Sequence, residues 1–220
     1  MEISYKPQNG QSNNEIKPFY LDLSLWALIV SNLVVAVWAL TKRWRLGPIM
    51  WVYWCQSVII GIFWFIKILI LKGFSTEGYT VDGKTVEPTK KTKISTARHF
   101  LIDYGIIHLI YAGFLYIKLE NIRVASILLM ACVFLLYESF SFVYNRKWDE
   151  ERKPKIVKLL TFPTIRILPM HVIIIAYGVS GGAALEKRTP LAIFMLLKIV
   201  ADALTHILER SRVRFLGYAR

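Results

Sequence analysis

Four ionisable residues interrupt an apolar stretch near the end of the chain. The segment "LLKIVADALTHILER" contains Lys198, Asp202, His206 and Glu209. At about 100° per residue, the last three lie about 40°, 80° and 20° around a helix from Lys198. A carboxylate and an imidazole on one helix face can exchange protons or hold a cation, while a lysine balances their charge. Asp202 and His206 also have the i, i+4 spacing at which two side chains of one helix can share a metal ion.

The rest of the sequence predicts that this face lies within a membrane. Of the 220 residues, 55% are hydrophobic and 20% are charged, and the apolar residues come in blocks. A helix needs roughly 20 residues to cross the hydrocarbon core of a bilayer. Blocks of about that length lie at 21–41, 47–71, 99–117, 124–144, 164–184 and 190–209. We therefore expect one all-α domain, a bundle of six transmembrane helices over 21–209, in a multi-pass protein of the cell membrane.

The net charge of +13 is distributed in a way that predicts the orientation of the bundle. With six spans, segments 1–20, 72–98, 145–161 and 210–220 lie on one side, and they hold 18 of the 28 Lys and Arg residues. The short loops on the other side hold 7. Basic residues accumulate on the cytoplasmic side of membrane proteins, so both termini are predicted to be cytoplasmic.

The expected partners of the chain follow from this location. They are the lipid bilayer itself and either a second copy of the chain or other membrane subunits. The sequence has no basic groove with interleaved stacking aromatic residues, so we do not expect nucleic-acid binding.

Further polar residues lie within the predicted spans, and they are Gln56, Asp103, His108, Glu138, Arg166 and His171. A charged side chain at the centre of a membrane helix costs roughly 2.5–3.5 kcal/mol on insertion scales, so such residues usually face the interior of a bundle. Nearly all of them lie in the cytoplasmic half of their spans. We predict one polar layer that opens toward the cytoplasm, with Asp202 and His206 at its centre. Lys67 and Glu209 lie close enough to span ends to reach the interface with their long side chains.

Three functions are compatible with this polar layer. The first is an intramembrane site for a cation, a proton or a small ligand. The second is a structural or accessory subunit in which the polar seam only specifies helix packing, with Lys198 and Asp202 as an ion pair within one helix. The third is a membrane-embedded enzyme that uses a divalent metal held by His206, Asp202 and His171. The sequence has no HExxH motif and no nucleophile pattern, so it favours the first two over catalysis.

Three shorter segments predict features of two loops and of the fifth span. The segment "VDGK" at 81–84 carries a hairpin signal with Asp-Gly at the turn, which predicts an exposed ribbon or a disordered loop. The charged segment 145–161 predicts a short amphipathic helix at the membrane interface. Pro169 frees a backbone carbonyl one turn earlier in the fifth span, and His171 is placed to hydrogen-bond across the resulting kink.

Four segments carry a more specific pattern: "YWCQSVIIGIFWFIKI" at 53–68, "RHFLIDYGIIHLIYAGFLY" at 98–116, "RILPMHVIII" at 166–175 and "LKIVADALTHILE" at 197–209. They resemble a family of bacterial and archaeal polytopic membrane proteins, domain of unknown function 6498. The matching residues are Tyr53, Trp54, Gly61, Tyr104, Gly105, Phe114, Arg166, His171, Lys198, Asp202 and His206. The resemblance implies a membrane location and a helical fold, without an established activity.

The chain departs from the family pattern at three positions. The family tends to have an acidic residue where Gln56 stands, and histidines where Asp103 and Tyr111 stand. If these positions form a metal or proton site in the family, this chain has lost or rearranged part of it.

Overall fold

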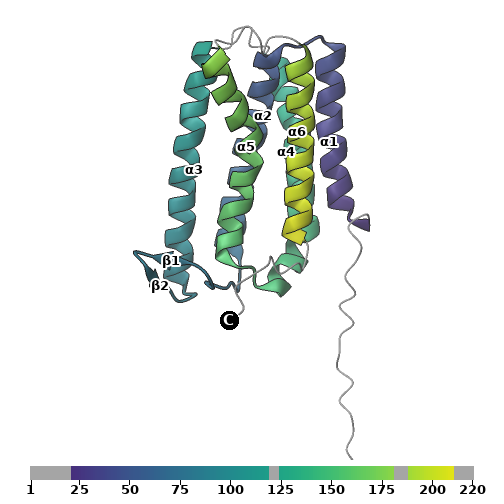
Figure 1. The fold of residues 1–220 in the computed structure, drawn as a ribbon. Coiled ribbons are helices and arrows are strands. Elements are labelled where there is room, and N and C mark those ends of the chain that lie inside the picture. Colours follow the sequence, from purple (N-terminus) through teal and green to yellow (C-terminus); the bar gives the residue numbers. More distant parts are fainter. Residues whose placement is uncertain (1–20, 119–123, 181–187, 211–220) are drawn as a thin grey trace, which may run out of the picture.

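A computed structural model describes residues 21–118, 124–180 and 188–210. Within these residues the chain forms six α-helices and one two-stranded hairpin (Figure 1). The helices are α1 Leu23–Thr41, α2 Leu46–Ile70, α3 Lys90–Lys118, α4 Val124–Arg152, α5 Ile156–Ser180 and α6 Arg188–Arg210. All six are long and apolar enough to cross a membrane, which confirms the predicted bundle of six spans. The predicted tails 1–20 and 210–220 lie outside the described residues, apart from the helical Arg210.

Three helices are longer than the apolar blocks from which they were predicted. α3 begins at Lys90 rather than at 99, α4 continues to Arg152 rather than ending at 144, and α5 begins at Ile156 rather than at 164. Hydropathy marks only the part of a helix that suits hydrocarbon, whereas helical turns can continue into the interface. The separate interfacial helix predicted within 145–161 is therefore wrong, because α4 and α5 occupy most of that segment.

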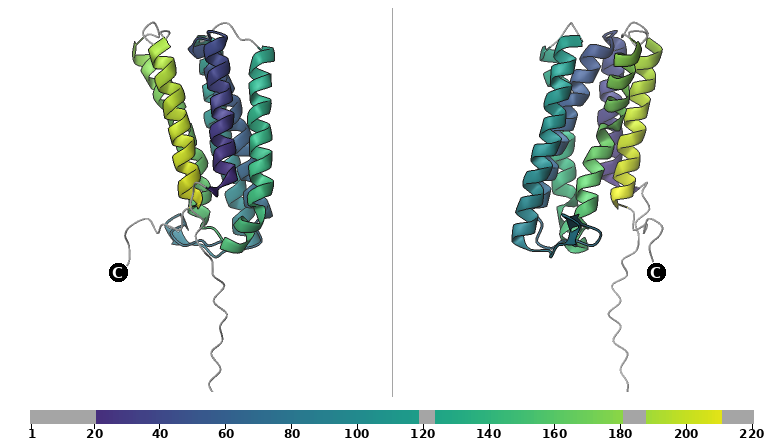
Figure 2. Two further views of the ribbon diagram at one scale, coloured as in Figure 1. Left: turned by 90° about the vertical axis from the view of Figure 1, so that its right-hand side faces the viewer. Right: turned by 60° about the vertical axis from the view of Figure 1, so that its left-hand side comes forward.

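Five of the helices form a closed ring, and α3 lies outside it. α1 packs against α4 and α6, α6 packs against α5, and α2 completes the ring between α4 and α5. α3 packs mainly against α2. The helices run along a common axis, and α1 begins at the end of the bundle where α6 finishes (Figures 1 and 2). We call this end, which also holds the hairpin, the termini end.

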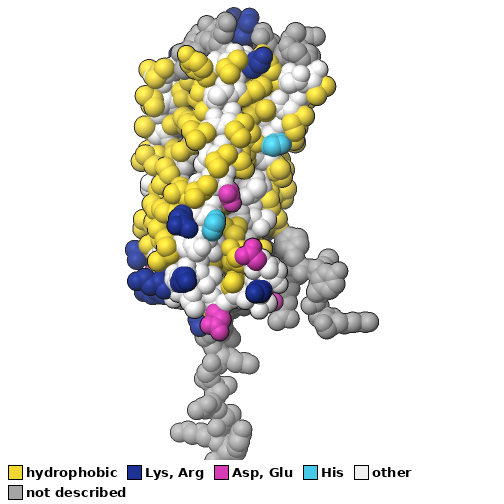
Figure 3. All heavy atoms as spheres, turned by 90° about the vertical axis from the view of Figure 1, so that its left-hand side faces the viewer, with side chains coloured by type: hydrophobic (Ala, Val, Ile, Leu, Met, Phe, Trp, Pro, Cys, Tyr) yellow, Lys and Arg dark blue, Asp and Glu magenta, His cyan; other side chains and the backbone are white. Residues whose placement is uncertain are grey.

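The bundle has apolar outer faces, and its largely apolar core also encloses several ionisable side chains. Its outer faces expose large hydrophobic side chains along the helices, including Leu109 and Leu136, which are 72% and 71% exposed. On the face seen in Figure 3, hydrophobic side chains cover most of the surface, and most of the charged side chains in view lie toward the termini end. The buried ionisable residues are His108, Glu138, Arg166, Lys198, Asp202 and His206. This distribution suits a protein surrounded by lipid.

The predicted hairpin is present at the termini end. It consists of β1 Thr80–Val81 and β2 Lys84–Thr85, paired antiparallel. Asp82 and Gly83 at the turn have φ values of 51° and 72°. Two successive positive φ values are what a type I′ turn requires, and Asp-Gly is a favoured pair for it. The sequence signal at 81–84 is therefore confirmed as an ordered ribbon.

Hydrogen bonds and ion pairs fix the loops at the termini end. Ser75 N donates to Pro154 O at 3.0 Å, and Ile156 N donates to Ser75 O at 2.9 Å. Glu150 accepts from Lys72 Nζ at 2.9 Å and from Arg146 Nε at 3.2 Å. These two bonds, the one from Lys72 first, lower the pKa of Glu150 below its ordinary value. The connection after α2 is thus tied to the turn between α4 and α5.

Gly61 permits the contact that attaches α3 to the ring. A Cβ atom at Gly61 would lie 2.5 Å from Cε1 of Tyr104, so only glycine allows the tyrosine ring to pack there. The Tyr104 hydroxyl then donates to Ser57 O at 2.9 Å and accepts from Ser57 Oγ at 3.1 Å. Trp54 Nε1 adds a bond to His108 O at 2.9 Å.

The Gly61→Ala variant tests this contact. The added methyl group overlaps with a buried aromatic ring, so we expect the free energy of unfolding to fall by about 1–3 kcal/mol. Thermal unfolding of the purified protein in detergent measures the change. Gly105→Ala in α3 is the matched control, because a Cβ there meets nothing within 4 Å. Equal losses in both variants would contradict the proposed role of Gly61.

Candidate functional site

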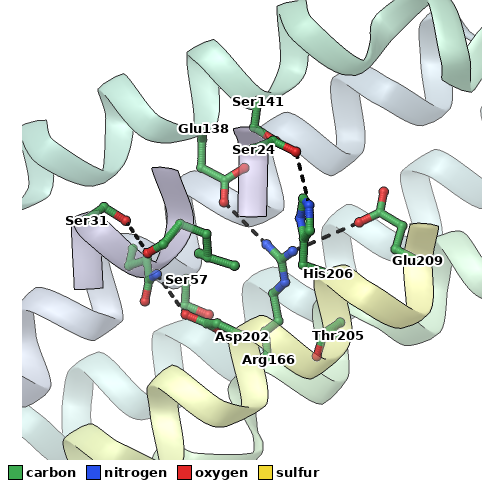
Figure 4. A network of polar contacts seen from close by, with 12 residues as sticks. Ser24, Ser31, Ser57, Glu138, Ser141, Arg166, Asp202, Thr205, His206 and Glu209 are labelled. Carbon is green, nitrogen blue, oxygen red and sulfur yellow. Dashed lines mark hydrogen bonds and ion pairs between the residues drawn. The ribbon is translucent and has the colours of Figure 1, made fainter. Parts of the chain in front are cut away.

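The interior of the five-helix ring holds a set of hydrogen bonds and ion pairs, which we divide into two clusters. Figure 4 labels Asp202 of the inner cluster, and Glu138, Arg166, His206 and Glu209 of the outer cluster. The inner cluster consists of Asn32, Gln56, Lys198 and Asp202. The outer cluster lies nearer the termini end and consists of Lys67, Glu138, Asp149, Arg166, His206 and Glu209. Every helix of the ring contributes to one cluster or both. α3 contributes to neither.

Asp202 is the centre of the inner cluster. Its Oδ1 lies 2.5 Å from Lys198 Nζ, and its Oδ2 accepts from Gln56 Nε2 at 3.0 Å and from Asn32 Nδ2 at 3.4 Å. Lys198 and Asp202 are 2% and 0% exposed. The ion pair expected within one helix is therefore present, and the amides of Asn32 and Gln56 connect it to α1 and α2.

Lys198 also contacts a second helix, because Lys198 Nζ donates to Arg166 O in α5 at 3.2 Å. Pro169 in the same helix lacks the N–H that would bond the carbonyl of Ile165, the residue before Arg166. His171 does not bridge the kink, because its Nδ1 contacts the hydroxyl of Tyr111.

The outer cluster is a chain of ion pairs. Arg166 Nη1 lies 3.3 Å from Glu138 Oε1, and Arg166 Nη2 lies 4.0 Å from Glu209 Oε2. The other oxygen of Glu209 lies 2.6 Å from Lys67 Nζ, which also contacts Asp149 Oδ2 at 2.9 Å. Two cations thus face three carboxylates.

A cavity of about 40 Å³ lies in the outer cluster. All six residues of the cluster line it, together with apolar walls that include Phe63 and Trp64. A water molecule needs roughly 10–15 Å³ of such space, so about three waters fit. The cavity therefore offers the charged groups a small amount of solvent inside the bundle.

His206 connects the outer cluster to the start of α1. Its Nε2 lies 3.0 Å from Ser24 Oγ and 3.1 Å from Asp22 Oδ2. Ser24 Oγ already donates its proton to Asp22 Oδ1 at 2.6 Å, so the serine can only accept from the imidazole. Nε2 of His206 therefore carries a proton. Asp22 also accepts from Ser24 N at 2.9 Å, the capping bond of α1.

A comparison with protein families shows which family the chain belongs to. Residues 15–214 match a family of unknown function, DUF6498. The chain belongs to this family. The resemblance carried by the four sequence segments is thereby confirmed. Comparison of the DUF6498 chain with curated proteins and with solved structures finds no significant match. Its function must therefore be argued from the geometry of the two clusters.

Three predicted site residues of the DUF6498 chain lie outside both clusters, and they are Asp103 and His108 on α3 and His171 on α5. Asp103 is exposed on α3, and His108 in the same helix is buried, with Nδ1 donating to Tyr104 O at 2.7 Å. The expectation that they share the polar layer is therefore wrong. The predicted block 99–117 places Asp103 about 6 Å from its edge at roughly 1.5 Å per residue, so the interface is within reach of this side chain.

The predicted metal ligands are not assembled into one site. His171 is exposed on α5, whereas Asp202 and His206 are buried inside the ring. Among the residues that the structure describes, no group of three or more His, Cys, Asp or Glu is placed to hold a metal ion. The donor set of the described clusters therefore does not fit the divalent metal considered from sequence.

Four other members of the clusters were not predicted from the sequence to lie there. Asn32 lies in the middle of an apolar run, "IVSNLVV", and that isolation was the available signal. Lys67 and Glu209 were expected to reach the interface, but they pair with each other and are 13% and 14% exposed. Asp149 lies beyond the predicted end of its span, where only the longer α4 brings it into the cluster.

The inner ion pair of this DUF6498 protein can be tested by single and double substitution. Lys198→Met or Asp202→Asn leaves one buried charge without its partner, and each should lower the free energy of unfolding by about 3–5 kcal/mol. The Lys198→Met, Asp202→Leu double variant should lose clearly less than the sum. Denaturant or thermal unfolding in detergent measures all three. Lys72→Met removes an exposed ion pair and should have no measurable effect. Additive losses in the double variant would argue against direct coupling.

Proposed function

We propose that this protein binds a proton reversibly in the outer cavity, with His206 and the carboxylates around it as the acceptors. The observation that carries the proposal is the cavity itself, which is lined by His206 and by the carboxylates of Glu138, Asp149 and Glu209. An imidazole and carboxylates beside a small amount of water are groups that exchange protons in proteins.

Histidine is the side chain best suited to this exchange, because its unperturbed pKa lies near neutrality. His206 lines the cavity and contacts Asp22 at 3.1 Å. A second proton on the imidazole would turn this contact into an ion pair. Proton binding would then strengthen the attachment of the start of α1 to α6, which gives the site a structural consequence.

The size of the cavity favours a proton over an organic ligand. Its volume is about 40 Å³, whereas pockets for small organic molecules usually measure roughly 300–1,000 Å³. A site of this size also gives little support to a membrane-embedded enzyme with an organic substrate. A polar seam that only specifies packing would not need the cavity.

The half of the bundle away from the termini end supports the view that protons reach the outer cavity only from the termini end. Beyond Lys198 the interior contains a cluster of aromatic rings from three helices. The ring centroid of Tyr53 lies 5.9 Å from that of Phe134 and 5.4 Å from that of Phe194. This aromatic layer supports a site that is loaded from the termini end rather than a pore. The surplus of basic residues on that side supports a cytoplasmic termini end and a bundle in the cell membrane under this proposal.

Trp64 provides an optical test of proton binding. It lines the cavity, and Lys67 Nζ lies 4.7 Å from its ring centroid. Its fluorescence, taken as wild type minus Trp64→Phe, should change with pH because proton binding changes the local charge. The change should be absent in His206→Gln. It should persist in His171→Gln, where the histidine lies on the outer surface. If the Trp64 fluorescence of His206→Gln changed with pH as in the wild type, His206 would not be the proton acceptor.

The orientation can be tested with a single cysteine. Lys84→Cys in the exposed strand β2 is introduced after Cys55 and Cys132 are replaced by alanine. If the termini end is cytoplasmic, a membrane-impermeant maleimide should label this cysteine only after the cells are opened. Labelling in intact cells would reverse the orientation and would place the cavity on the outer side of the membrane.

A further inference from the structure

We infer that the outer face at the start of α3 is a docking surface for the headgroups of anionic phospholipids, with Lys91 and Arg98 as its main contacts. The surface lies outside the ring of five helices, and the inference does not depend on proton binding in the outer cavity. It rests on the direction, the depth and the unpaired charge of these two side chains.

Lys91 and Arg98 continue the lipid-facing stripe of α3. At about 100° per residue, both lie within about 40° of Ile102 and Leu109 around the helix. All four of these side chains are exposed. The buried Tyr104, which packs against α2, lies about 140° around the helix from Leu109. The two cations therefore face the lipids that surround the bundle rather than the neighbouring helix.

The depth of these residues matches the headgroup layer. The apolar block of α3 begins at residue 99, so Arg98 lies at the edge of the hydrocarbon. The headgroup layer on each side of a bilayer is roughly 5–8 Å thick. Lys91 lies about 10 Å farther along the helix than Arg98, and its long side chain can bend back toward the lipid phosphates. Ile94, between the two cations, is exposed as well, which suits the boundary between headgroups and acyl chains.

The two cations have no anionic partner in the protein. Within residues 21–118, 124–180 and 188–210, no ion pair or hydrogen bond involves the side chain of Lys91 or Arg98. Asp103 is the only acidic residue of α3, and it lies about 140° around the helix from Arg98. A lipid phosphate would supply a partner, at the end of the helix where the dipole also favours negative charge.

The hairpin extends this positive surface. Thr96 Oγ1 donates to the Tyr79 hydroxyl at 3.2 Å, which attaches the segment before β1 to α3. The hairpin accordingly lies beside the start of α3 (Figure 1). Segment 78–98, which contains both, holds five Lys and Arg residues and two acidic ones. The surface is therefore net positive, and the exposed Val81 adds an apolar side chain to it.

Titration of the purified protein with lipid in detergent tests the inference, with native mass spectrometry to count the bound lipids. We expect phosphatidylglycerol to bind more tightly than phosphatidylcholine, and to bind less tightly as NaCl is raised, because salt screens exposed charges. The Lys91→Gln, Arg98→Gln double variant should bind phosphatidylglycerol about fivefold less tightly for each cation removed. Its binding of phosphatidylcholine should not change. The Lys91→Arg, Arg98→Lys double variant keeps both charges and should bind as the wild type does.

The Lys72→Gln, Lys155→Gln double variant is the matched control. It also removes two cations from the termini end, but Lys72 and Lys155 already pair with Glu150 and Glu77. It should therefore keep the phosphatidylglycerol affinity of the wild type. Without added lipid, both glutamine double variants should unfold at the wild-type temperature, because the replaced side chains are on the surface.

Three results would overturn the inference. They are equal affinity of the wild type for the two lipids, unchanged phosphatidylglycerol binding in the Lys91→Gln, Arg98→Gln variant, and an equal loss of binding in the control variant. The last result would show that the total charge of the termini end attracts the lipid, rather than this face of α3. Failure of the Trp64 titration would leave the lipid measurement unaffected, so the two proposals can fail separately.

Discussion

Arg166 holds the two polar clusters together, because its side chain belongs to one and its backbone to the other. The guanidinium lies between Glu138 and Glu209, while the carbonyl oxygen accepts from Lys198. Arginine stays charged under all ordinary conditions and has five donors in a rigid plane, which suits it to bridging two carboxylates. A charge of this kind inside a membrane has to be enclosed and paired. The helices that carry its partners, α4 and α6, are therefore fixed against α5.

The need to pair buried polar side chains also explains why five helices form a ring with α3 outside it. Each ring helix carries at least one polar side chain that needs a partner in the interior, and the ring gives all of them access to one another. α3 contributes no side chain to either cluster. His108 bonds a carbonyl of its own helix, and Asp103 is exposed. α3 is held instead by aromatic packing and by the absence of a side chain at Gly61.

The spans could be predicted from sequence because hydrophobic length is a local property of the chain. The shared face of Lys198, Asp202 and His206 could also be predicted, since it depends only on the periodicity of one helix. Their partners could not. Asn32 and Gln56 meet Asp202 because of which helices are neighbours and how each is rotated, and hydropathy contains no information on either. Lys67 illustrates the limit, because a lysine near a span end reaches equally well toward water or toward a carboxylate on the next helix.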